Sequence, residues 1–165
     1  MRLFEFIGIL VLGTVLARPA LAERLDTCYR SEVDPNTRRR YQNIAQWESD
    51  RNDLWANAPA RPYPWSLLWG HRVAEQESPR ARKLGSDKRQ HCYVGCRIAN
   101  DVGYDVAVYA AYYKEEQDLL DCDPKSYFEP KDIEATVIGA DLAVINPGGA
   151  DAKYCSRQCR KKFSK

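Results

Sequence analysis

What the sequence has little of narrows the classes to which it can belong. Its 165 residues include one methionine and two histidines, and 25 basic residues against 23 acidic ones leave a net charge of only +2. A nearly neutral chain gives no electrostatic case for binding nucleic acid. The length excludes a large multidomain enzyme, and an aromatic content of 11% argues against general disorder. We therefore expect one modest folded domain.

Familiar motifs are absent as well. The sequence contains no nucleophile elbow, no His-Glu-x-x-His helix and no phosphate-cradling glycine loop. It has no internal repeat, and apolar and polar residues alternate only over short stretches, which argues against a β-sheet protein. No motif therefore names a reaction, and the predicted class is all-α.

No apolar run reaches the roughly 20 residues that a membrane-spanning helix needs. The longest run, Phe6 to Ala17, follows the basic Arg2 and precedes the small-residue sequence Ala20-Leu21-Ala22. This order is typical of a secretory signal peptide over residues 1–22, and the short run disfavours the alternative, a membrane anchor. We expect a periplasmic or secreted mature protein without a transmembrane segment.

The cysteines predict a disulfide framework. An even number in an exported chain indicates disulfides, and here there are six: Cys28, Cys92, Cys96, Cys122, Cys155 and Cys159. The second and third, like the last two, lie one helical turn apart on one face. Two antiparallel helices carrying them can be bridged twice, Cys92 to Cys159 and Cys96 to Cys155, which leaves Cys28 for Cys122. A four-thiolate zinc site is the less favoured alternative, because such sites usually occur as knuckles in reducing compartments.

The chain before the cysteine-rich core divides into two parts. Residues 23–58 contain an amphipathic helix that we expect from the Asp34-Pro35 cap to about Ala58. Residues 59–85 are a linker rich in proline and tryptophan, with a short helix at 66–76 followed by a polar connector that contains Pro79.

Residues 86–165 form the expected core, a small disulfide-stapled bundle. Helices are predicted at 87–100, 104–120 and 130–145, and a last one follows the capping residue Asp151. With the helices that precede them, they make an all-α bundle of four to five helices.

Four ionisable residues fall on helix faces that otherwise read as buried: His91, Glu115, Asp118 and Asp132. Each continues a stripe of small residues that lets helix backbones approach closely. If these stripes face a shared centre, the four side chains come together, and a buried carboxylate then needs a partner. One imidazole with two or three carboxylates suits a divalent metal ion or an acid/base pair.

Three interpretations of this cluster stay open. It is a structural network that fixes helix register, in which Lys114 neutralises Asp118 one turn away. Alternatively, His91, Glu115 and Asp132 hold a divalent metal ion, the one cofactor that the sequence suggests. The third interpretation is acid/base chemistry without metal. If the protein is an enzyme, Asp118 and Lys114 are its catalytic candidates.

Residues 86–143 resemble a known family. The resemblance is carried by the strings Asp87-Lys88-x-x-His91, Lys114-Glu115-x-x-Asp118 and Asp132-x-x-Ala135-Thr136-x-x-Gly139. They are similar to those of the YfiM-like predicted periplasmic lipoproteins and, more distantly, of VanZ-like proteins. The resemblance implies a compact helical envelope domain with its important positions in these strings. The chain differs from the family in lacking a lipobox and in carrying the paired cysteines.

Two functions follow as hypotheses. The first is a non-enzymatic periplasmic accessory protein that binds another envelope or secreted protein through Trp55, Tyr63, Trp65 and Trp69, because aromatic residues beside prolines favour interfaces. An immunity protein against a periplasmic toxin is one form of this role, and aromatic residues that merely cover the core are the alternative. The second is a metal-assisted hydrolase of an envelope substrate, in which Asp118 orients or deprotonates a water.

Overall fold

The computed structural model describes residues 33–34, 37–120 and 128–164 of the chain. These residues form six α-helices: α3 (Ile44–Ala56), α4 (Pro64–Arg82), α5 (Asp87–Asp101), α6 (Tyr104–Leu120), α7 (Pro130–Ile145) and α8 (Ala152–Lys162). The all-α prediction is confirmed, with six helices in place of the expected four to five. None of the described helices is long and apolar enough to span a bilayer.

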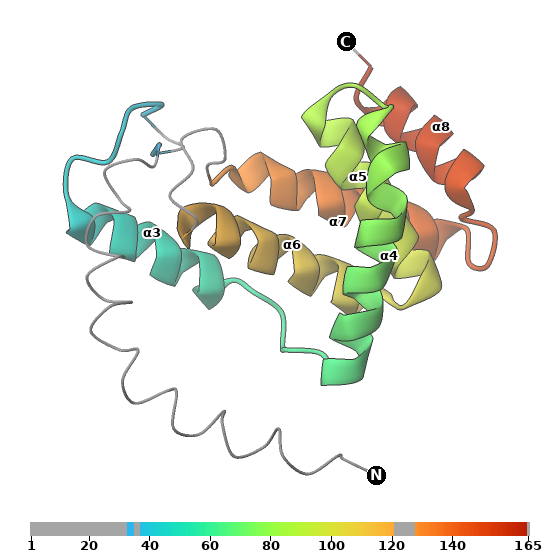
Figure 1. Ribbon diagram of the computed structural model, residues 1–165, viewed down its shortest axis with the longest axis horizontal. Helices are drawn as coiled ribbons and strands as arrows, with labels where there is room; N and C mark the ends of the chain where they lie inside the picture. Colours follow the sequence, from blue (N-terminus) through green and yellow to red (C-terminus); the bar gives the residue numbers. More distant parts are fainter. Residues whose placement is uncertain (1–32, 35–36, 121–127, 165) are drawn as a thin grey trace, which may run out of the picture.

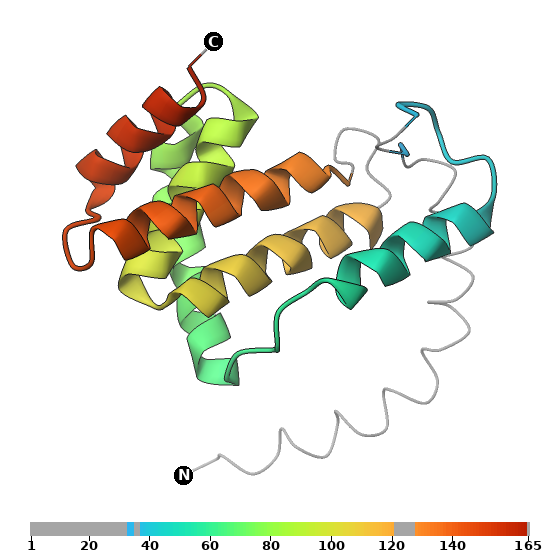
Figure 2. The same ribbon diagram turned by 180° about the vertical axis from the view of Figure 1, so that it is seen from behind.

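Three helices run side by side and are crossed by two others. α6 lies between α3 and α7, and α4 and α5 cross this layer at one end (Figures 1 and 2). α8 packs on the outer side of α5 and α7. α5 and α7 pack closely against each other. Several of the charged residues singled out in the sequence lie in the first turns of these two helices.

α5 and α7 touch backbone to backbone because each contributes a glycine to the contact. A Cβ atom on Gly95 would overlap the carbonyl oxygen of Thr136, and one on Gly139 would overlap the carbonyl oxygen of Cys92. Neither glycine has a positive φ, so the contact requires a missing side chain rather than an unusual backbone. Small residues on facing helices thus set the register between α5 and α7.

Two disulfides join α5 to α8 in the predicted pairing. Cys92 is bonded to Cys159 and Cys96 to Cys155, with Cα–Cα distances of 5.8 and 5.9 Å. All four residues are completely buried. Disulfides of this kind indicate folding in an oxidising, non-cytoplasmic compartment. The predicted Cys28–Cys122 bridge and the signal peptide at 1–22 lie outside the described residues.

The N-terminal helix begins later than predicted. Asp34 does not cap a helix: its carboxylate accepts hydrogen bonds from the N–H and the hydroxyl of Thr37, and its N–H donates to the carbonyl of Arg39. These bonds close a turn, so α3 starts only at Ile44, after the N-cap Asn43. Its buried residues, Trp47 and Leu54, pack on the end of α6.

α4 is longer than predicted and contains Pro79, which we expected in a non-helical connector. Pro79 is exposed and removes a single backbone donor, whereas contacts on the opposite face hold the helix together. Glu77 is buried and accepts a hydrogen bond from the hydroxyl of Tyr93 on α5, and Ala81 is buried one turn later. Tertiary packing thus outweighs the local preference of proline.

The last four helices match their predicted limits within two residues. α5, α6 and α7 begin and end where the sequence places helices, and Asp151 caps α8 by accepting a hydrogen bond of 2.7 Å from the N–H of Tyr154. Strong terminators, such as Gly103 and Pro130, separate these helices in the sequence.

Gly139→Ala tests the contact between α5 and α7. Alanine favours an isolated helix by about 1 kcal/mol, but its methyl group would overlap the backbone of Cys92. Overpacking of this kind costs about 1–3 kcal/mol. We expect the variant to lower the free energy of unfolding in urea, whereas Glu134→Ala on the exposed face of the same helix leaves it within about 0.5 kcal/mol. A Gly139→Ala variant at least as stable as the wild type would contradict the close approach.

Removing the disulfides should have a more than additive effect. Each bridge closes a loop of 67 or 59 residues, which is worth about 4 kcal/mol when it acts alone. While one bridge remains, the other closes only a short loop, worth about 2–3 kcal/mol. We expect Cys→Ala replacement of both pairs to destabilise the protein by more than the sum of the two single-pair variants, as measured by urea unfolding. Additive losses would show that the bridges constrain the unfolded chain independently.

Candidate functional site

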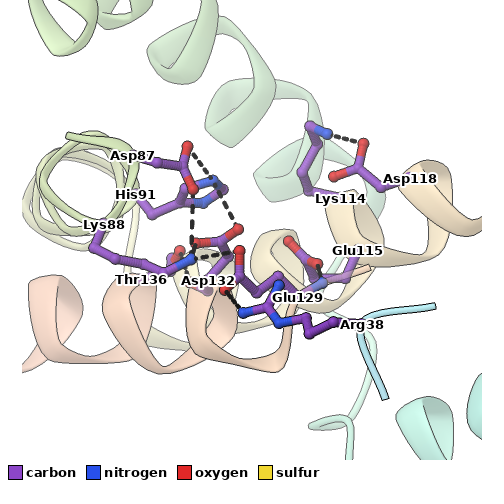
Figure 3. Close-up of polar contacts among 10 residues, drawn as sticks. All are labelled: Arg38, Asp87, Lys88, His91, Lys114, Glu115, Asp118, Glu129, Asp132 and Thr136. Carbon is purple, nitrogen blue, oxygen red and sulfur yellow. Dashed lines mark hydrogen bonds and ion pairs between the residues drawn. The ribbon is translucent and has the colours of Figure 1, made fainter. Parts of the chain in front are cut away.

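The contact between α5 and α7 brings their first turns together. Gly95 lies against Thr136, and one turn earlier on each helix stand His91 and Asp132. Asp87 begins α5, one turn before His91, so three potential ligands converge from two helices (Figure 3). This is the convergence that the small-residue stripes predict for His91 and Asp132.

The imidazole of His91 lies at ion-pair distance from two carboxylates, just beyond the range of a hydrogen bond. The Nε2 atom of His91 lies 3.6 Å from Oδ1 of Asp87 and 3.6 Å from Oδ2 of Asp132. Both distances exceed the hydrogen-bond range. Ligand atoms about 2.1 Å from a tetrahedral cation lie about 3.4 Å from one another. One donor atom from each residue falls within 4.8 Å of the other two, a group able to hold a metal ion.

A lysine binds the other side of the same carboxylate. Nζ of Lys88 forms a short ion pair with Oδ1 of Asp132 and lies 3.0 Å from Oε2 of Glu129. Arg38 contacts the second oxygen of Glu129 at 3.1 Å. Burial lowers the pKa of Lys88, but the hydrogen bonds to Asp132 and Glu129 outweigh it, and the pKa is raised overall. Lys88 therefore stays charged and leaves Oδ2 of Asp132 facing His91.

Glu115 lies behind this group and is almost completely buried. Its Oε2 atom accepts a hydrogen bond of 2.8 Å from the N–H of Glu129, the residue that precedes α7. Burial raises the pKa of Glu115 to about 8, against the effect of that bond and with the help of the charges of Asp132 and Asp118. The carboxyl thus keeps its proton at neutral pH and ties α6 to the start of α7.

Asp118 and Lys114 form an ion pair one turn apart on α6. Asp118 is buried, whereas half of the Lys114 side chain is exposed. In Figure 3 this pair lies on the α6 side of the view, apart from Asp87, His91 and Asp132. The pairing is the one that the structural interpretation of the cluster predicts for these two side chains.

The structure thus unites most of the predicted residues and adds others. Among the described residues, the three-ligand group contains His91 and Asp132 but takes Asp87 in place of Glu115. The sequence did offer a signal for Asp87, which precedes His91 by one turn on the same face. Glu129 also had a sequence signal, because it stands just before Pro130, which begins a helix. No sequence pattern pointed to Arg38.

The remaining predicted residues lie elsewhere. The second histidine of the chain, His71, is also remote from the site: it is exposed, with its Nε2 atom 3.6 Å from Oε1 of Glu75. Trp55 is half-buried and packs against Tyr109, with ring centroids 5.6 Å apart. Tyr63, Trp65 and Trp69 are exposed rather than part of the core.

Comparisons with known proteins add no further constraint on the site. No protein-family model matches the chain, and neither the curated proteins nor the solved structures yield a match. The function is therefore argued from the geometry of the site.

Glu115→Gln tests the protonated carboxyl. In the folded protein the pKa of the Glu115 carboxyl is about 8, whereas the ordinary pKa of a glutamate carboxyl, which applies to the unfolded chain, is 4.5. The contribution of Glu115 to the free energy of unfolding therefore falls as pH rises through this window, by about 1.4 kcal/mol per pH unit. Glutamine is neutral at every pH and keeps an oxygen for the Glu129 N–H. We expect the free energy of unfolding of the variant, measured in urea between about pH 5 and 8, to rise relative to that of the wild type as pH rises.

A stability difference that stays constant over this range would contradict a buried, protonated Glu115. Glu134→Gln provides the control, because Glu134 is exposed and lies on the outer face of α7. It removes one carboxyl from α7 without touching the buried site, so it controls for the loss of a carboxyl in itself.

Proposed function

We propose that this is an exported envelope protein that binds a divalent cation between α5 and α7 and uses it to hydrolyse an envelope substrate. The observation that carries the proposal is the spacing of Asp87, His91 and Asp132, whose donor atoms are too far apart for hydrogen bonds and close to the edges of a metal coordination shell. The export of the chain is supported by the buried disulfides and by the signal-like N-terminal sequence.

The donor set favours a borderline or hard divalent cation such as zinc or manganese. One imidazole nitrogen and two carboxylate oxygens are ligands that both ions accept. Three protein ligands leave at least one position for water, the arrangement found in catalytic rather than structural zinc sites. Asp87 is 61% exposed, so this position is accessible from solvent.

The local charges also favour a cation. Among the described residues, the carboxylates of Asp87, Glu129 and Asp132 pair with two fixed positive charges, those of Lys88 and Arg38. A divalent ion beside His91 would offset the excess negative charge. Lys88 would then hold Asp132 in the orientation that presents Oδ2 to the ion, as outer-shell groups commonly do.

The cation itself would supply most of the activation of water. A bound divalent ion lowers the pKa of its water to about 7, so little additional base is required. Asp118 is already paired with Lys114 one turn away on α6. The two residues remain the catalytic candidates of the proposal, with the lesser role of positioning groups on the α6 side of the site.

A non-enzymatic role is the second candidate, and one contact favours it. Lys88 bridges Asp132 on α7 and Glu129 just before it, a contact that by itself can fix the register of α5 and α7. In that case the cluster is structural, and the protein acts by binding a partner.

The first test is the metal content of the mature protein, purified from an oxidising compartment without chelators. We expect about one zinc or manganese ion per chain in the wild type and, in titrations of the metal-free protein, an affinity at least about tenfold lower in Asp87→Asn and His91→Ala. His71→Ala is the matched control, because its imidazole lies at the same distance from a single carboxylate one turn away. Equal affinity in the wild type and in His91→Ala would refute the site.

Hydrolysis is tested separately, with phospholipid, glycan and peptide substrates. The proposal predicts turnover of one class that is lost with a chelator, restored by the metal and absent in His91→Ala. If metal binds with the expected dependence on His91 but no class is hydrolysed, the site is structural and the second candidate holds.

A further inference from the structure

One end of the molecule collects exposed cations. The loop after α4 and the last turn of α8 lie side by side at this end (Figures 1 and 2). Residues 78–86 and 152–165 contain nine lysines and arginines and no Asp or Glu. Five of these cations are exposed at the two helix ends, and we call them the basic end: Arg82, Lys83, Arg160, Lys161 and Lys162.

The two helix ends are held together by Arg89 in the first turn of α5. Its guanidinium group donates hydrogen bonds to the carbonyl of Phe163, at the end of α8, and to the carbonyl of Leu84, just after α4. One cation thus offsets the partial negative charge of two helix C-termini. Because Arg89 already supplies this stabilisation, the cations of the basic end are not needed for it.

The basic end differs from the other charged parts of the described chain in having no acidic partner. The ion pairs that lysine and arginine form within the described residues involve six other residues: Arg38, Arg51, Arg80, Lys88, Arg97 and Lys114. Asp87, which follows the loop after α4, lies 3.5 Å from Lys88 and 3.6 Å from His91, so it belongs to the candidate metal site. A chain with a net charge of only +2 therefore carries a local excess of positive charge at this end.

The character of the basic end favours a flat anionic surface over a protein partner. Protein interfaces are usually anchored by large apolar side chains, and the exposed residues of this kind in the described chain lie on the first half of α4, on α6 and at the end of α7. The cations come from two helices and form a patch rather than a row. A patch of four to eight lysines and arginines suits the two-dimensional array of phosphates on a bilayer better than a single polyanionic chain.

We propose that the basic end docks on the surface of an anionic phospholipid bilayer by electrostatic contact alone. The buried face of α8 is joined to α5 by both disulfides, so α8 meets the lipid phosphates with its cations and inserts no apolar face. None of the five cations belongs to the metal-ligand group, so the inference stands independently of the proposed hydrolysis.

The experiment is the cosedimentation of the mature full-length protein with vesicles of phosphatidylglycerol and phosphatidylcholine, and with vesicles of phosphatidylcholine alone. We expect binding to the anionic vesicles at roughly 0.05 M salt and its loss at about 0.5 M, where charges are screened within a few ångströms. Tryptophan emission should not shift to shorter wavelength, because Trp65 and Trp69 lie about 20 Å or more from Arg82 along α4.

Removal of the charges should weaken this binding in steps. Each lysine or arginine near an anionic surface is worth about fivefold in affinity. Replacement of Arg160, Lys161 and Lys162 by glutamine should therefore reduce the affinity for anionic vesicles by more than about tenfold. Arg82→Gln with Lys83→Gln tests the α4 part of the basic end separately and should also weaken binding.

The matched control removes the same net charge from other segments, by replacing the exposed residues Arg40, Arg61 and Lys131 with glutamine. It should bind the anionic vesicles at least about fivefold more tightly than the variant of α8. An equal loss in both variants would overturn the proposal, as would the absence of binding by the wild type. So would binding to a soluble sulfated glycan that depends on Arg160, Lys161 and Lys162 without binding to vesicles.

Discussion

Gly95 and Gly139 allow the backbones of α5 and α7 to touch, and the positions of the charged groups at the candidate site follow from that contact. A side chain on either glycine would push the helices apart. With the helices in contact, His91 and Asp132 face each other one turn away from the crossing point. The disulfides to α8 hold α5 from its other side, so the site is built on a braced helix rather than on a loop.

The close contact concentrates negative charge, and the fold balances it in two ways. Lys88 and Arg38 pair with Asp132 and Glu129. Glu115, the most deeply buried carboxyl among the described residues, keeps its proton because burial raises its pKa to about 8. What remains is the group of Asp87, His91 and Asp132, which no hydrogen bond joins and which a divalent cation would complete. In the metal proposal, a divalent cation neutralises the negative charge that Lys88 and Arg38 leave unbalanced.

Much of the helical core could be predicted from the sequence, and the reasons are local. Gly103, Pro130 and Asp151 end or begin helices whatever surrounds them, and the four-residue spacing of the cysteines fixes which can face each other. The predictions of helix limits are wrong where contacts between residues far apart in the sequence decide the structure. α4 continues through Pro79 because Glu77 is held by Tyr93, a contact that no local pattern shows.

The candidate site could be predicted from the sequence only in part. Small-residue stripes were enough to bring His91 toward Asp132, because they mark where helices can approach. They did not show that Lys88 would pair with both Asp132 and Glu129, since this depends on how the first turns of α5 and α7 are aligned.

The most direct test of the account is the location of a bound metal ion by anomalous X-ray diffraction from crystals of the mature protein grown with manganese or zinc. The account predicts an anomalous peak between Nε2 of His91, Oδ1 of Asp87 and Oδ2 of Asp132, with Lys88 still paired to the other oxygen of Asp132. Full occupancy at another position, or well-ordered side chains at this site with no peak at millimolar metal, would contradict it.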